Sequence, residues 1–98
     1  MTLYKLRTGV VLTQICGEYA LIAANAVREF CPAICQINET AAFLLRLLIS
    51  GADEKELERA AAEEYEIEDP AEARSAIEGF LQQMLEAGYL LKEGETNE

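Results

Sequence analysis

The chain has 98 residues, of which 51% are hydrophobic, and a formal net charge of −10. This length suits one domain with one core, and the hydrophobic content excludes a chain that is disordered by composition. The charge is unevenly spread: residues 1–50 carry a net charge of +1, and residues 51–98 carry −11. Because the second half would repel a polyanion, the composition argues against a nucleic-acid partner.

The sequence also argues against a membrane protein. The longest strongly apolar run, residues 41–49, is interrupted by Arg46 and is far shorter than the roughly 20 residues that a membrane span needs. The start of the chain lacks the basic and hydrophobic regions of a signal peptide. We therefore expect a cytoplasmic protein that does not enter a membrane.

Three cysteines, Cys16, Cys31 and Cys35, are an odd number for a chain without an export signal. One interpretation is three reduced thiols that behave as small hydrophobic residues. The alternative is a metal or redox pair at Cys31 and Cys35. Because the chain has no histidine and no C-x-x-C motif, a tetrahedral metal site would need carboxylates or a second chain. The first interpretation is favoured, with no metal and no cofactor.

The first half of the chain has strand patterns. Residues 10–23 predict a β-hairpin with a turn at Gly17-Glu18, and residues 33–37 predict a third strand. Alternation within this strand places Cys35 and Ile37 on one face and Ile34 and Gln36 on the other. Pro32 just before the strand suits an edge position. Residues 2–7 are extended and could exchange between protomers, so a homodimer is possible.

The second half predicts three helices. Asn38 is a good N-cap for a helix that Gly51 stops, Asp53 and Glu56 form a capping-box pattern, and Asp69-Pro70 starts a third helix that ends at Gly88. Residues 89–91 pack back on the fold. Strands followed by helices indicate the α+β class. We expect one domain over residues 1–91 and a mobile polar tail over residues 92–98.

Catalytic motifs are missing from the sequence. The chain has no histidine, no G-x-S-x-G motif and no glycine-rich phosphate loop. A cysteine without a base is weak support for a nucleophile. We therefore expect a binding protein and not an enzyme.

Five segments, spread over residues 4–91, resemble the PqqD family, which is named for pyrroloquinoline quinone (PQQ) biosynthesis. They are residues 4–12, 17–22, 37–44, 77–81 and 86–90, and the junction Ile37-Asn38-Glu39-Thr40 before an apolar helix is the most specific. The resemblance implies a winged-helix-like domain with a three-stranded antiparallel sheet followed by three helices. Cys31, Cys35 and Leu85 depart from the family pattern and leave open whether the client belongs to PQQ synthesis.

The resemblance also implies a function. Domains of this family recognise ribosomally made, post-translationally modified peptides (RiPPs): they bind the leader of the precursor and present it to a modifying enzyme, often a radical S-adenosylmethionine protein. The leader adds as a strand to the edge of the third strand, beside the third helix, which is β-augmentation.

The implied strand addition, together with the apolar residues of the third helix, predicts where the peptide binds. The client is expected to pair with the backbone of residues 33–37 and to rest apolar side chains on Leu81 and Leu85, with Arg74 contacting an acidic client residue. An alternative for Leu85 is that it packs under Tyr89 or the tail. The complete predicted site is Ala33, Ile34, Cys35, Gln36, Ile37, Arg74, Glu78, Leu81 and Leu85.

Three other functions compete with peptide binding. A winged-helix DNA-binding regulator would normally show a basic recognition helix, whereas residues 69–87 contain one basic residue, Arg74. A thiol or metal module would be built on Cys31 and Cys35. The last alternative is a structural partner that docks on a larger enzyme without touching peptide.

Overall fold

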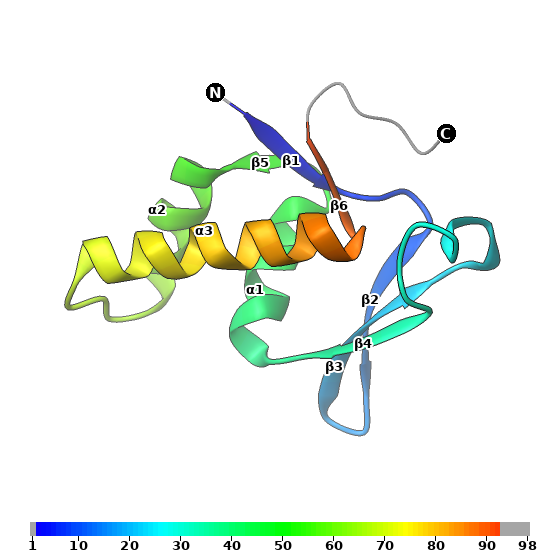
Figure 1. Cartoon of the computed structure of the whole chain (residues 1–98). Helices are drawn as coiled ribbons and strands as arrows, with labels where there is room; N and C mark the ends of the chain where they lie inside the picture. Colours follow the sequence, from blue (N-terminus) through cyan, green and yellow to red (C-terminus); the bar gives the residue numbers. More distant parts are fainter. Residues whose placement is uncertain (1, 93–98) are drawn as a thin grey trace.

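The computed structural model describes residues 2–92 and has an α+β fold with two separate antiparallel sheets (Figure 1). One sheet has the strand order β2-β3-β4, and the other has the order β5-β1-β6. The elements are β1 (Leu3–Leu6), β2 (Val10–Ile15), β3 (Glu18–Ala23), the 3₁₀ helix η1 (Asn25–Val27), β4 (Ile34–Ile37), α1 (Glu39–Leu48), β5 (Ala52–Asp53), α2 (Glu54–Glu64), α3 (Pro70–Ala87) and β6 (Leu90–Lys92).

The sheet β2-β3-β4 confirms the predicted hairpin and third strand. The hairpin turn is Cys16-Gly17, one residue earlier than expected, because Ile15 pairs with Glu18. Cys16 and Gly17 have φ of 52° and 82°, and two positive φ values are what a two-residue type I′ turn requires. Strand β4 pairs only with β3 in this sheet, so it is an edge strand, as Pro32 indicated.

The second sheet was not predicted. Strand β1 pairs with β5 on one side and with β6 on the other, so residues 3–6 pair within their own chain. Leu90 and Leu91, which were expected only to pack back, form β6 together with Lys92, which was predicted as the first residue of the tail. The remainder of that tail, residues 93–98, lies outside the described residues.

The three helices begin at the predicted N-caps, and α3 ends at the predicted glycine, whereas α1 ends at Leu48, three residues before Gly51. The Asn38 side chain accepts a hydrogen bond from the backbone N–H of Ala41 (2.8 Å), and Asp53 and Glu56 form both hydrogen bonds of a capping box. The Asp69 carboxylate accepts from the first turn of α3, which ends at Gly88 in the left-handed region (φ 90°). These caps satisfy backbone groups that a helix end leaves without partners.

The core lies where α1 meets both sheets and the other two helices. Leu21, Leu45, Leu48, Leu57 and Tyr89 are fully buried. Helix α1, apolar almost all round in sequence, is central to this cluster. No helix among residues 2–92 is long and apolar enough to cross a membrane.

Candidate functional site

The open edge of β4 is the first part of the candidate site. The backbone N–H of Ala23 donates to the carbonyl of Ala33 (2.9 Å), and the register then places residues 35 and 37 opposite residues 21 and 19. In an antiparallel pair, the residues that exchange hydrogen bonds alternate with residues whose N–H and C=O point away from the partner. Ile34 and Gln36 are therefore the residues that direct their backbone groups to the open edge.

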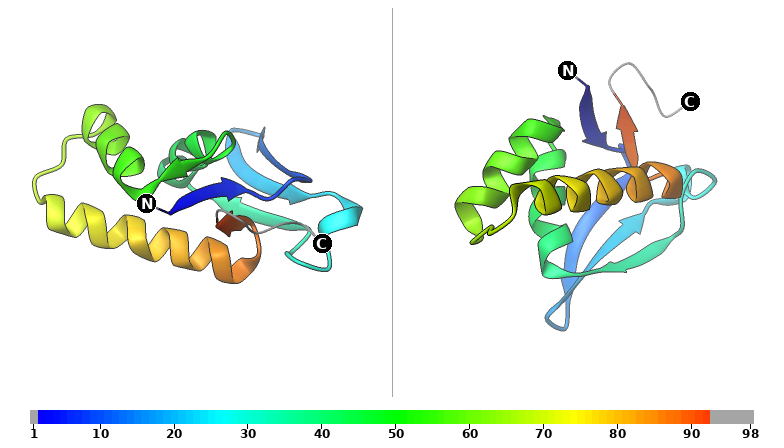
Figure 2. Two further views of the ribbon diagram at one scale, coloured as in Figure 1. Left: turned by 90° about the horizontal axis from the view of Figure 1, so that it is seen from above. Right: turned by 60° about the vertical axis from the view of Figure 1, so that its left-hand side comes forward.

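The start of β4 is held against the C-terminal end of α3. The hydroxyl of Tyr89 donates to the carbonyl of Pro32 (2.8 Å), and the Arg7 Nε–H donates to the carbonyl of Gly88 (2.7 Å). The Arg7 guanidinium also lies 4.5 Å from the centroid of the Phe30 ring. Both views of Figure 2 show this end of α3 beside the loop before β4. Burial raises the pKa of Tyr89 to about 12, so the hydroxyl remains a donor at neutral pH.

An apolar cavity of about 360 Å³ lies at the other end of β4. Asn38, the residue that follows β4, lines it, and the rings of Phe43 and Tyr65 form part of its wall, 5.5 Å apart and nearly perpendicular. Helix α3 contributes four residues at helical spacing, which are Ala73, Ala76, Ile77 and Phe80. The remaining lining residues are Thr40, Ala41, Leu44, Ala61 and Ile67. Volume and lining both fall in the range of sites that take apolar ligands.

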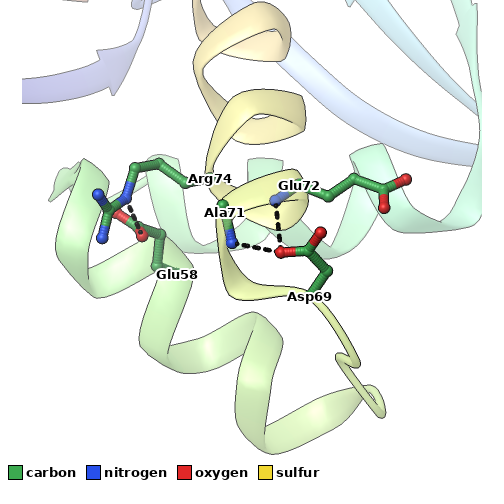
Figure 3. Close-up of polar contacts among 5 residues, drawn as sticks. All are labelled: Glu58, Asp69, Ala71, Glu72 and Arg74. Atoms are coloured by element: carbon green, nitrogen blue, oxygen red, sulfur yellow. Dashed lines mark hydrogen bonds and ion pairs between the residues drawn. The ribbon is translucent and has the colours of Figure 1, made fainter.

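The predicted site residues on α3 lie on a different side of the helix from this cavity. Arg74 points to α2, where its Nε lies 3.1 Å from Glu58 Oε1 (Figure 3). Glu78 is close enough to the start of α2 to repel Glu54, whose pKa is raised first by burial and then by Glu78. Leu85 is half-buried and lines a depression with Leu90 and Leu91, two residues of β6.

Leu81 is only 2% exposed and belongs to the core, so it offers no surface to a ligand in this structure. The structure therefore brings residues 33–37 together as an edge, but it does not place Arg74, Glu78, Leu81 and Leu85 along that edge. The physical reason is that α3 has apolar residues on two sides, and local sequence does not tell which side faces β4. The cavity residues were missed because alanines and aromatics at helical spacing are typical of a core.

The cysteines form no disulfide in the described part of the chain. Cys31 is buried and its thiol donates to the carbonyl of Val27 (3.4 Å), whereas Cys35 is half-buried and Cys16 is exposed. Burial raises the pKa of the Cys31 thiol, which disfavours the reactive thiolate. No group of three or more potential metal ligands occurs among residues 2–92. These facts fit the interpretation of Cys31 as a small core residue.

The edge strand, the flanking helix and the apolar cavity define a small α+β binding domain. The family model described as coenzyme PQQ synthesis protein D (PqqD) matches residues 32–90, which is more than half of the chain. The chain therefore belongs to the PqqD family, as the resemblance predicted. A comparison with curated proteins gives no match.

Two solved structures have the same fold. A lasso peptide synthetase B1 complexed with its leader peptide is 22% identical, with a TM-score of 0.70 over 90% of this chain and 96% of that one. TbiB1 in complex with the TbiA(beta) leader peptide is 21% identical, with a TM-score of 0.72 over 94% of this chain and 98% of that one. At this identity the similarity establishes the fold.

Proposed function

We propose that the protein binds the leader of a ribosomally made precursor peptide by strand addition to β4 and presents it to a modifying enzyme. The observation that carries the proposal is the edge of β4, on which Ile34 and Gln36 direct backbone groups away from β3. Membership of the PqqD family and the leader peptides bound to the two similar structures support it. Main-chain pairing supplies affinity in this mode of binding, and side-chain pockets supply specificity.

The finer parts of the proposal concern the partner and the setting. The protein acts without catalysis of its own, in the cytoplasm, and hands the bound leader to an enzyme such as a radical S-adenosylmethionine protein. Residues 33–37 are the strand that the leader joins. Of the other predicted residues, Arg74 and Glu78 lie beside α2, Leu85 lies beside β6 and Leu81 lies in the core, so their contact with the leader stays a prediction.

The test removes one backbone donor from the open edge. Gln36→Pro deletes the outward N–H, and proline is tolerated at an edge where that N–H has no partner in the sheet. Gln36→Ala is the matched control, because it removes the same side chain and keeps the N–H. A binding peptide is first selected from displayed random peptides and then measured by calorimetry.

We expect Gln36→Pro to weaken binding about tenfold, in line with the loss of one backbone hydrogen bond and some strand geometry, while Gln36→Ala retains the affinity. Circular dichroism and a thermal melt check that both variants fold. Equal affinities for the two variants, or peptide-induced amide shifts that miss residues 33–37, would overturn strand addition at β4.

A further inference from the structure

The cavity between α1 and α3 is placed to receive a side chain from a peptide on β4. Asn38 follows β4 directly, caps α1 and lines the cavity. In Figure 1, the C-terminal end of α3 lies beside the loop that precedes β4. The N-terminal end of α3 lies beyond the point where β4 ends. A peptide strand on the edge of β4 therefore runs toward the cavity.

The chemistry of the cavity selects a large apolar side chain. Among the residues that line it, Asn38, Thr40 and Tyr65 are the ones with polar side-chain groups. A volume of about 360 Å³ holds roughly a dozen water molecules at liquid density. Releasing water from walls such as Ile67 and Phe80 favours an apolar occupant, and an aromatic ring buries more surface there than a small side chain would.

Carboxylates are frequent in the sequence next to Tyr65 and Ile67, the two cavity residues that come from the end of α2 and the linker to α3. The stretch 60–73 contains no basic residue, and its acidic residues are all exposed: Glu63, Glu64, Glu66, Glu68, Asp69 and Glu72. The two basic residues that border this stretch lie elsewhere: Arg59 lines another depression with Leu47 and Glu63, and Arg74 contacts Glu58. The potential at the cavity is therefore negative, which attracts cationic groups and repels anionic ones.

We infer that the client carries a bulky apolar side chain flanked by lysine or arginine, and that this side chain occupies the cavity while the basic residues face the carboxylates of residues 63–72. This inference rests on the proposed function and narrows the class of peptide bound. It replaces the expectation that Arg74 contacts an acidic residue of the client. A second copy of the chain is a poor occupant, because each copy carries a net charge of −10 and seven of the twelve residues that line the cavity come from the acidic half.

The experiment begins with a selection of random displayed dodecapeptides on the wild-type protein. We expect the selected sequences to share one large apolar residue with lysine or arginine close to it. One such peptide, synthesised with tryptophan at the apolar position, reports burial by fluorescence, because the protein contains no tryptophan. Its affinity should fall roughly threefold or more when the salt concentration is raised to about 0.3 M.

Two pairs of variants then test the cavity and the charge. Ala76→Leu fills the cavity from an exposed position on α3, and we expect about tenfold weaker binding, as for a lost apolar contact. Ala62→Leu on the exposed face of α2 is its control. The double variant Glu66→Lys and Glu68→Lys should weaken binding and reduce the salt effect, whereas Glu29→Lys with Glu86→Lys changes the net charge equally away from the cavity.

The outcomes separate this inference from the proposed function. If peptides bind and shift the amides of residues 33–37, but lack the apolar and basic residues or ignore Ala76→Leu, the inference is wrong and strand addition stands. If the two charge variants behave alike, the basic part of the inference is wrong. If no displayed peptide binds at all, both proposals fail.

Discussion

Gly88 shows how one residue determines the position of α3. Its φ of 90° lies in the region that favours glycine, and an added Cβ would clash with the backbone carbonyl of Phe30. Only a residue without a side chain lets the end of α3 approach the loop before β4 this closely. The same residue accepts the hydrogen bond from Arg7.

We expect Gly88→Ala to lower the free energy of unfolding by more than about 2 kcal/mol, because it adds backbone strain to a steric clash. Gly79→Ala is the comparison, since Gly79 lies inside α3 with nothing within 4 Å of the added Cβ. That change should raise stability by about 0.5–1 kcal/mol. Urea unfolding of the two variants measures the difference, and similar values would contradict the assigned role of Gly88.

At the scale of elements, the capping box of α2 joins a helix to the second sheet. Asp53 is the last residue of β5 and the N-cap of α2, and it is buried (6% exposed). Its carboxylate accepts from the N–H of Glu56 at 2.8 Å, while Glu56 Oε1 accepts from the N–H of Asp53 at 3.2 Å. Asp53 therefore fixes where β5 stops and α2 begins.

Asp53→Ala removes the acceptor and should destabilise the protein by about 1–2 kcal/mol, the usual cost of losing such a cap. Asp53→Asn keeps an acceptor oxygen and should lose less than half as much. Thermal or urea unfolding of both variants gives the answer. Equal losses would mean that the carboxylate acts through its charge and not through the cap.

The elements differ in how well the sequence predicts them. The helices are predictable from local sequence, because Asn38, Asp53 and Asp69 are recognisable N-caps at their starts. Strand β4 is predictable because its side chains alternate between two faces. Strands β1, β5 and β6 are two to four residues long and pair over large sequence separations, such as Leu3 with Asp53 and Tyr4 with Lys92. Such pairings depend on tertiary packing and leave no local pattern.

The same distinction holds for the candidate site. The edge residues 33–37 were predictable because one strand forms them, and the structure places Ile34 and Gln36 outward as the alternation indicated. The cavity needs α1, α2 and α3 in their final arrangement. Its residues, among them Phe43 and Phe80, look like ordinary core residues until the helices are assembled.

At the scale of the whole molecule, the acidic helices lie on one side and the sheet β2-β3-β4 lies on the other. In Figure 1, α2 and α3 lie together, and the sheet extends away from the loop that joins these two helices. The half of the chain with a net charge of −11 contains both of these helices. This division gives a polyanion no basic helix face to bind.

We therefore expect no binding to random duplex DNA at physiological salt, because α3 carries a single basic residue, Arg74, and that residue is paired with Glu58. Gel shift or fluorescence anisotropy with micromolar protein measures this. A salt-sensitive complex would favour the DNA-binding alternative over peptide recognition.

Helix α3 is held unequally at its two ends. Gly88, Tyr89 and Arg7 bind its C-terminal end to the rest of the fold, whereas residues 70–76 contain no buried side chain, and Ile77 is the first residue of the helix in the core. Segments with few buried contacts open at low free-energy cost. The end of α3 beside the cavity can therefore adapt its position while the other end stays fixed. A cavity with one adjustable wall suits a protein that binds several related precursors better than one that selects a single precursor.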